Sequence, residues 1–251
     1  MAAQNLRAAL FVLPLLTIAG CGARLDEPQL GSYRAALELP GGEAPFGLEI
    51  AKEKNGYVLY LSIGSERTRV SDVTVANAEL VAVFPNSKSS LRATMYRKRL
   101  EGGVTVVATG SAAQTVPLRA TLGTPYWFYE KSLTDNADVS GRWALTYGND
   151  EGGGIPKAIL VLEQEHDRVT GILTTPNGDE HAVHGQVHGD DVQLSRFAGG
   201  VADLYKLRVD DAGDLAGEYW QGLATHEKIA ARRNADATLE DAGQVLGTSS
   251  Q

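Results

Sequence analysis

The stretch PKAILVLEQEHDRVTGILT, residues 156–174, decides the fold class of this chain. It contains two short segments rich in aliphatic residues, 156–164 and 168–174, on either side of the turn His166-Asp167. Short apolar segments bounded by turn-forming residues, with apolar and polar positions alternating, indicate half-buried β-strands. The stretch therefore predicts an antiparallel hairpin, and similar segments recur through most of the chain.

The recurring pattern predicts eight strands in each half of the chain. In the first half they fall near 31–39, 45–52, 57–63, 67–75, 78–84, 90–99, 103–109 and 115–122, and in the second half near 141–147, 156–164, 168–174, 180–187, 190–197, 201–209, 214–220 and 225–232. Turns are expected at Asn55-Gly56 and Glu101-Gly102-Gly103. Only 234–244 has helical propensity, and it is short for a stable helix.

The two halves can be laid over each other with an offset of about 110 residues, which predicts an internal duplication. The matching pairs are Gly31–Arg34 with Gly141–Ala144, Pro45 with Pro156, Leu48–Ile50 with Ile159–Val161, Val73–Phe84 with Gln186–Phe197, and Gly102-Gly103 with Ala212-Gly213. Eight strands are enough to close a small up-and-down barrel. We therefore expect an all-β protein of two tandem antiparallel barrel-like halves. A single sandwich built from both halves is the alternative.

The N-terminus carries a processing signal. Arg7 precedes an apolar run, 8–16, which is too short to cross a bilayer as a helix and is typical of a secretory signal peptide. The following Ile18-Ala19-Gly20-Cys21 resembles a bacterial lipobox. That resemblance implies cleavage before Cys21 and acylation of its thiol, and several acyl chains anchor a protein stably. Gly22 in place of Asp favours the outer membrane.

These features divide the chain into six expected segments. They are a signal peptide (1–20), an acylated cysteine and tether (21–29), the first half (30–124), an aromatic junction (125–138), the second half (139–233) and a C-terminal tail (234–251).

Composition excludes several classes of function. The chain has 251 residues and a net charge of -8, from 23 Lys and Arg against 31 Asp and Glu. Nucleic-acid binding and a polybasic membrane patch both depend on clustered cations, so neither is expected. The hydrophobic content of 43% is sufficient for a packed core. A single cysteine rules out an intramolecular disulfide, a CxxC pair and a multi-cysteine zinc site.

Aromatic residues supply the candidate binding site. The junction sequence PYWFY, residues 125–129, is dense in aromatic side chains. Aromatic residues usually serve packing, so the junction is expected to plug the space between the halves, and a platform for a peptide or glycan is the functional alternative. The candidate ligand- or partner-binding residues are Tyr126, Trp127, Tyr129, Trp220 and His226.

The histidines of the second half do not predict a metal site. His184 and His188 share one face of a strand but lie ~13–14 Å apart, and His181 points to the other side. Val183 and Val187 form the expected inward set, which leaves His184, Gln186 and His188 in solvent. No Gly-x-Ser-x-Gly elbow, phosphate loop or EF-hand occurs. No catalytic residue, metal or cofactor is therefore predicted.

Part of the second half resembles a known family. The residues concerned are Asp190–Gly200, Gly213–Gly222, His226-Glu227 and Ala230–Arg233. They are similar to the β-rich N-terminal region of bacterial TlpA-type thioredoxin-like disulfide reductase lipoproteins. That family also has a thioredoxin domain with a CxxC motif, which this sequence lacks, and Ala198 and Val201 replace its expected Asp and His. The resemblance therefore implies no redox activity here.

A patch that recurs in this family is matched by Glu218, Tyr219, Trp220 and His226, and the resemblance implies no catalytic role for it. Tyr219 and Trp220 alternate across a strand, so one of them should lie in the core, and Trp220 is the one expected inside the barrel.

These observations predict a non-enzymatic, lipid-anchored β protein of the bacterial envelope. It would face the periplasm from the outer membrane and bind a partner protein or a small apolar ligand. One alternative is an accessory to a separately encoded thioredoxin-like redox protein. Another is an envelope hydrolase using carboxylates such as Glu163, Glu165, Glu218 and Glu227, and a third is a remnant without a role of its own.

Overall fold

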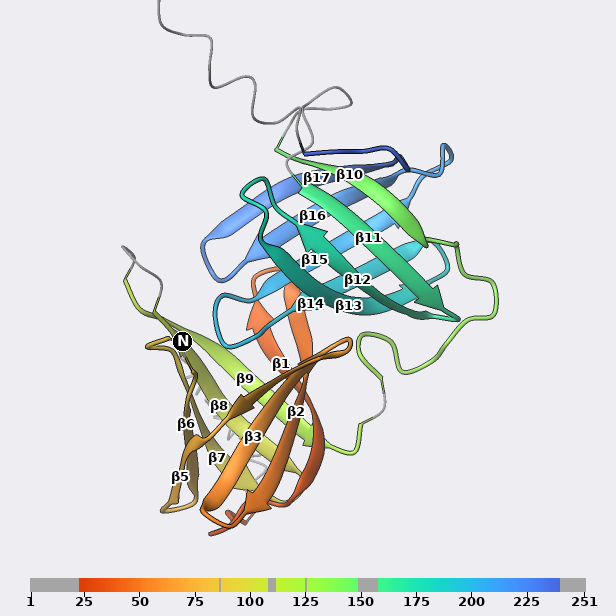
Figure 1. The fold of residues 1–251 in the computed structure, drawn as a ribbon. Helices are drawn as coiled ribbons and strands as arrows, with labels where there is room; N and C mark the ends of the chain where they lie inside the picture. Colours follow the sequence, from red (N-terminus) through yellow and green to blue (C-terminus); the bar gives the residue numbers. More distant parts are fainter. Residues whose placement is uncertain (1–22, 86, 108–111, 125, 149–157, 240–251) are drawn as a thin grey trace, which may run out of the picture.

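The computed structural model describes residues 23–85, 87–107, 112–124, 126–148 and 158–239. Within these ranges the chain forms strands and turns, and no helix capable of crossing a membrane is present. The strands make two antiparallel sheets, one from each half of the chain, which lie side by side (Figure 1). The predicted fold of two tandem barrel-like halves is confirmed. The predicted signal peptide and Cys21 lie outside the described residues.

The second half is a closed eight-stranded barrel in which every strand pairs with its neighbours along the chain. Its closure is the antiparallel pairing of the first strand with the last, as in Trp143 opposite Arg233. The strands are β10 (Gly141–Tyr147), β11 (Ala158–Glu165), β12 (Arg168–Thr174), β13 (Glu180–His188), β14 (Asp191–Arg196), β15 (Asp203–Val209), β16 (Leu215–Gln221) and β17 (Thr225–Arg233).

The first half is a nine-stranded sheet curled into a nearly closed barrel. Its strands are β1 (Gly31–Leu39), β2 (Gly42–Glu53), β3 (Gly56–Ile63), β4 (Glu66–Val70), β5 (Asp72–Ala76), β6 (Glu79–Val83), β7 (Ser90–Tyr96), β8 (Arg99–Val106) and β9 (Gln114–Leu122).

The gap in the first barrel lies between β4 and β5, which only Ser71 separates. The sequence predicts one strand over 67–75, and the structure divides it. β4 pairs with β3 on one side, whereas β5 pairs with β6 on the other. The continuous segment β4–Ser71–β5 therefore forms both edges of the seam. β5 also lies close to β3.

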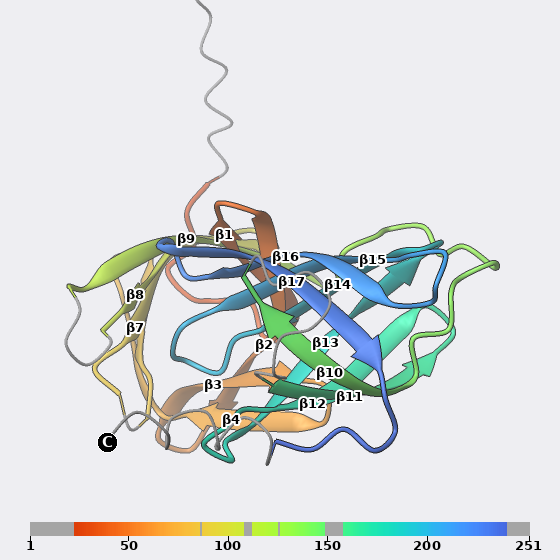
Figure 2. The same cartoon turned by 90° about the horizontal axis from the view of Figure 1, so that it is seen from above.

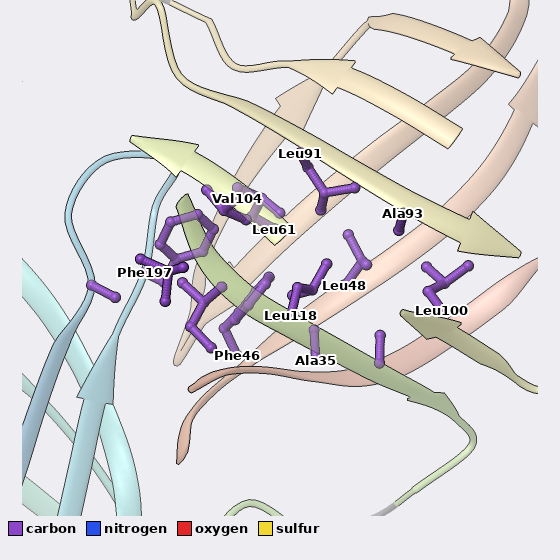
Figure 3. Close-up of a cluster of buried hydrophobic side chains, with 14 of the residues drawn as sticks. Ala35, Phe46, Leu48, Leu61, Leu91, Ala93, Leu100, Val104, Leu118 and Phe197 are labelled. Carbon is purple, nitrogen blue, oxygen red and sulfur yellow. The ribbon is translucent and has the colours of Figure 1, made fainter. Parts of the chain in front are cut away.

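Alternating side chains fill both barrels. In the second barrel, Trp143, Tyr205 and Tyr219 join aliphatic residues in one buried cluster. The core of the first barrel includes Phe46 and Leu48 on β2, with Leu118 on β9 (Figure 3). Because these buried side chains pack against one another in each barrel, the described strands enclose packed cores.

The core of the first barrel is completed by the second barrel. Phe197, in the loop after β14, lies 4.7 Å from the ring of Phe46 and 5.6 Å from that of Phe84 (Figure 3). Gly199 in the same loop has φ +92°, and a Cβ there would lie 3.0 Å from the Phe84 ring. The loop therefore needs glycine to approach this closely. In this way β13, β14 and β15 come to lie against β2 and β3 (Figure 2).

Two turn predictions need correction. The segment Glu101–Gly103 lies inside β8, and the turn is Arg97-Lys98, with Lys98 at φ 59°. Glycine at 102 reflects close strand packing, because a Cβ there would lie 2.0 Å from the Arg92 carbonyl oxygen. The Asn55-Gly56 hairpin exists, but its turn residues are Lys54 and Asn55.

The proposed duplication also needs adjustment in one pair. A Cβ at Gly217 in β16 would lie 2.0 Å from the Lys206 carbonyl oxygen, which is the situation of Gly102 in β8. Gly213, by contrast, lies in a turn. Gly217 in β16 thus has the same environment as Gly102 in β8, and each of these strands comes one before the last in its half. Both halves are up-and-down meanders, and their common origin stays a prediction.

Candidate binding groove between the two barrels

Residues 126–138, here called the strap, run between the barrels across the outside of the second one. The side chain of Arg34 on β1 donates from Nε to the Trp127 carbonyl oxygen at 2.8 Å. The backbone N–H groups of Phe128 and Tyr129 donate to Oε1 of Gln186 on β13, at 3.0 and 2.9 Å. Nε2 of Gln186 donates back to the Tyr129 carbonyl oxygen at 3.1 Å. The strap is thus bonded to both barrels.

His184 on β13 connects the second barrel directly to the first. The Gly64 backbone N–H donates to its Nδ1 at 3.3 Å, so Nε2 carries the proton and donates to the Pro45 carbonyl oxygen at 2.9 Å. Trp127 packs on the ring at 4.1 Å between centroids. Ser195 Oγ donates to the same Pro45 oxygen at 2.6 Å. Burial lowers the pKa of His184 to about 4, so the ring is neutral at neutral pH.

The sequence predicts that His184, Gln186 and His188 on β13 are exposed to solvent. This prediction is wrong for His184 and Gln186. His184 is 2% exposed and Gln186 is 5% exposed. Both side chains point away from their own barrel, as expected from Val183 and Val187 lying inside it, but the strap and the first barrel cover them. His188 is half-buried and stacks on Tyr129 at 4.5 Å. The described residues contain no cluster of three or more potential metal ligands.

A buried carboxylate fixes the later part of the strap. Asp167, in the β11–β12 turn, accepts hydrogen bonds from Ser132 Oγ and from Gln186 Nε2, the latter at 2.8 Å. Burial disfavours the charged carboxylate, but these hydrogen bonds favour it and lower the pKa of Asp167 below its ordinary value. The strap is therefore held at Ser132 as well as at its aromatic end.

Three open hollows adjoin the strap and together form what we call the groove. The large hollow, about 650 Å³, lies between strap residues Ser132–Asn136 and the β11–β12 turn. The middle hollow, about 460 Å³, lies between Trp127, Gly64 and the outer face of β11–β13. The small hollow, about 310 Å³, lies between Trp127 and β1–β3. Arg168 lines all three hollows.

The groove contains polar groups with free bonding capacity. Glu163, Glu165 and Arg168 are exposed, and none forms an ion pair or side-chain hydrogen bond within the described ranges. In the register of the β11–β12 hairpin, Glu165 lies opposite Arg168 and Glu163 lies opposite Thr170. The groove therefore presents a guanidinium donor next to two carboxylate acceptors.

The charged groups of the first barrel at the groove already have partners. Arg34 pairs with Glu43 at 2.6 Å, and Glu49 pairs with Arg67 at 2.6 Å. The Arg34 guanidinium also lies 5.1 Å from the centre of the Tyr126 ring. The free charges of the groove thus belong to the second barrel.

Three of the five candidate residues lie together, and two lie elsewhere. Tyr126, Trp127 and Tyr129 are all in the strap, half-buried. Trp220 and His226 lie on the outside of β16 and β17, where their rings stack at 4.8 Å. The structure therefore does not combine all five into one site.

The expected position of Trp220 inside its barrel is wrong. Tyr219 occupies the barrel interior, and Trp220 points outward against the first barrel. A Cβ on Gly41, in the β1–β2 turn, would lie 2.3 Å from the Trp220 ring. Trp220 is buried because this turn covers it, which strand alternation alone does not reveal.

A second buried carboxylate is fully paired. Asp203 in β15 is 2% exposed, and it accepts from Tyr219 Oη at 2.8 Å, Gln221 Nε2 at 3.1 Å and Arg196 Nη1 at 2.8 Å. Burial and the nearby Asp203 charge raise the pKa of Tyr219 well above its ordinary value. Because every oxygen has a partner, this cluster serves structure.

The sequence did not indicate Arg168, Thr170 and Gly64 as groove residues. Arg168 and Thr170 are outward positions on a strand, which are polar in most sheets. Gly64 belongs to a hairpin of the other barrel. Only docking of the two halves brings these residues next to Trp127.

These features define the chain as a two-barrel β protein with an open polar groove between the barrels. No protein-family model matches it, and no curated protein matches it. Among solved structures it is similar to a protein of unknown function from the DUF3598 family of Nostoc punctiforme. The identity is 15%, the match covers 82% of this chain and 96% of that chain, and the TM-score is 0.28.

Proposed function

We propose that this protein is a non-enzymatic, lipid-anchored binding protein of the bacterial envelope, whose ligand or partner binds in the groove. The observation that carries the proposal is the position of Arg168. Its exposed guanidinium lines all three hollows beside two free carboxylates. Convergent polar groups with unused bonding capacity at a concave surface are what a binding site requires.

Rigidity of the groove supports the same proposal. The strap is held by Gln186, Asp167, His184 and Arg34 at positions along its length. A site that is already ordered loses less conformational entropy when it binds. The strap thus supplies a wall that needs no ordering step.

The barrel interiors support a polar ligand over a small apolar one. The described strands enclose packed side chains, and Phe197 of the second half completes the core of the first barrel. An apolar ligand would have to displace these side chains, at a cost of lost packing. The groove, by contrast, is open and lined by charged and polar groups.

Binding is favoured over carboxylate-dependent hydrolysis. Glu163 and Glu165 do line the groove together, since they alternate on one face of β11. General acid catalysis depends on a carboxyl group held protonated, commonly by burial, and both of these side chains are exposed. Their arrangement suits acceptance of hydrogen bonds from a ligand.

The anchoring part of the proposal rests on the lipobox-like Ile18–Cys21. Replacing Cys21→Ser removes the thiol that would be acylated, so the chain should lose labelling by a fatty-acid probe and leave the membrane fraction. Cys21→Ser protein that remains in the membrane fraction would contradict the anchor.

The binding part is tested by blocking the groove. Thr170→Trp fills the middle hollow, whereas Thr115→Trp places the same bulk on an exposed position of β9 outside the groove. Both variants and the unchanged protein are used for affinity capture from envelope extracts. Material enriched by the unchanged protein and by Thr115→Trp, but lost with Thr170→Trp, supports the groove. Equal capture by all three proteins contradicts it.

The identity of the captured material also distinguishes a general binding protein from an accessory of a redox protein. An accessory of a separately encoded redox protein would retain a thioredoxin-like partner. Capture of such a partner would favour that role, which the resemblance of the second half suggests.

A further inference from the structure

We infer that the groove binds an extended, uncharged oligosaccharide of several sugar units. This inference rests on the proposed groove and adds the chemical class of its ligand. Five properties of the groove carry it: its length, its charge, its mixture of donors and acceptors, the apolar surface of Trp127, and the pairing of its strands on both sides.

The shape of the groove favours a long ligand over a compact one. The small and middle hollows share Trp127 and Arg168, and the middle and large hollows share Glu165 and Arg168. The hollows therefore follow one another around Arg168. Compact ligands are usually enclosed by a single, mostly apolar cavity, whereas all three hollows are open and bordered by polar residues. A chain-like ligand with one or two units in each hollow fits this arrangement.

The charge of the groove disfavours an anionic polymer. Glu163, Glu165 and Arg168 line the groove without an ion-pair partner in the described residues. The carboxylate of Asp167 adds a further negative group near Arg168 in the large hollow. Proteins that bind polyanions present several clustered cations, and this chain has a net charge of -8. A ligand of repeated negative charges would meet more carboxylates than guanidinium groups, so an uncharged ligand is favoured.

The hydrogen-bonding groups of the groove fit hydroxyl groups. A guanidinium only donates, and a carboxylate only accepts. A hydroxyl group does both, so neighbouring hydroxyls of a sugar can accept from Arg168 and donate to Glu163 or Glu165. Thr170 adds a hydroxyl of its own to the middle hollow.

Trp127 supplies apolar surface between these polar walls. Its ring is half-buried at the boundary of the small and middle hollows, and its packing on His184 holds it in place. Aromatic rings combine a large apolar surface with low conformational freedom. A sugar ring has C–H groups as well as hydroxyls, so it can contact Trp127 and the charged groups at once.

Strand pairing disfavours an extended peptide in the same groove. Peptides that bind alongside sheets usually add a strand to a free edge, with main-chain hydrogen bonds providing affinity. β11, β12 and β13 are each paired on both sides, as are β2 and β3 of the first barrel. The strands that form the groove therefore offer no backbone edge to a peptide.

Titration calorimetry on the purified chain tests the inference with six probes. Three are neutral hexasaccharides: maltohexaose, cellohexaose and hexa-N-acetylchitohexaose. The others are hexagalacturonate as an acidic sugar, an uncharged nonapeptide of Ser, Gly and Asn, and a basic nonapeptide of Lys, Ser and Gly. We expect at least one neutral hexasaccharide to bind and neither hexagalacturonate nor the peptides to do so.

The variants locate the binding. Arg168→Ala and Glu163→Gln should each weaken binding by about tenfold or more, because the first removes a charged donor and the second replaces a charged acceptor by a neutral, weaker one. Arg208→Ala, on an exposed arginine of β15 outside the groove, should change affinity by less than about twofold. Unchanged unfolding temperatures for all three variants ensure that the loss concerns binding.

Three results would overturn the inference. They are no binding of any neutral hexasaccharide, binding that Arg168→Ala leaves unchanged, and binding of hexagalacturonate or a peptide in preference to the neutral sugars. In the last case, loss of binding in Arg168→Ala would preserve the groove as the site while changing its ligand class. The capture experiment with Thr170→Trp then decides the proposed function separately.

Discussion

The two barrels differ in how their cores are completed. The second barrel closes on itself through the pairing of β10 with β17, and its buried cluster contains residues of its own half only. The first barrel has a seam between β4 and β5, and its buried cluster includes Phe197, Leu204 and Trp220 from the second. The two sheets therefore have similar strand orders, but only the second barrel builds its core entirely from its own residues. The first barrel depends on the second for part of its apolar burial.

The largest effect is expected from Phe197→Ala. This change removes the ring that packs on Phe46 and Phe84, and buried Phe to Ala changes typically cost about 3–5 kcal/mol. Although Phe197 belongs to the second half of the sequence, hydrogen exchange should rise in residues 31–122 more than in 141–233.

A matched change in the second barrel is the control. Leu194→Ala removes a fully buried side chain from the other core and should raise exchange in 141–233. If Phe197→Ala raised exchange in 141–233 alone, the dependence of the first barrel on the second would be wrong.

The next largest effect is expected from acidification at His184. Its pKa is about 4 in the folded protein and close to 6.5 when the chain is unfolded, so the unfolded state binds the proton first as pH falls. The stabilisation is complete above pH 6.5 and is lost as pH falls from 6.5 to 4. The difference corresponds to about 3 kcal/mol. Urea unfolding at several pH values measures it.

Two histidine variants identify the source of that pH dependence. His184→Gln should flatten the loss of stability between pH 6.5 and 4, since the amide has no proton to gain. His226→Gln, at an exposed histidine on β17, should retain it. A slope that persists unchanged in His184→Gln would assign the pH dependence to other groups.

A smaller, local effect is expected at the strap. Gln186→Ala removes the acceptor of the Phe128 and Tyr129 N–H groups and leaves them without this partner, which costs about 1–3 kcal/mol for a buried group. Exchange of these two amides should quicken while the barrel strands change little. Gln193→Ala, which removes only a hydrogen bond to the Tyr129 hydroxyl, is the control and should leave them slow.

The smallest effect concerns the seam of the first barrel and needs no mutation. β13 has partners on both sides, whereas β4 and β5 each have a hydrogen-bonded partner on one side only. Backbone amides without a ladder partner open more readily, so amides of β4 and β5 that face the seam should exchange faster than those of β13. Equal protection in β5 and β13 would mean that the seam is closed in solution.

Much of the fold could be read from the sequence, because strand formation is local. The predicted strands 31–39, 141–147 and 168–174 coincide with β1, β10 and β12. The turn prediction failed where a glycine is needed for close strand packing and not for a turn. Gly102 and Gly103 suggest a turn, but they lie within β8, where Gly102 permits close approach to Arg92.

The groove could be predicted only in part. The aromatic density of 125–129 drew attention to the junction, and in the structure Trp127 borders two hollows. Arg168 gave no signal, since a lone arginine after a turn is ordinary in any β-protein. Its importance arises from its position next to the strap and the first barrel.

The sequence by itself determined which side of β13 each residue faces, although it chose the wrong one of Tyr219 and Trp220 for the interior on β16. Val183 and Val187 were assigned to the barrel interior and lie there, and His184 and Gln186 were assigned to the outside and point outward. Only the tertiary structure decided what covers the outside. Alternation is a property of the backbone over two residues, whereas burial of His184 by Pro45 and of Trp220 by Gly41 joins residues more than a hundred positions apart. That physical difference explains why the barrels were predictable and the groove between them was not.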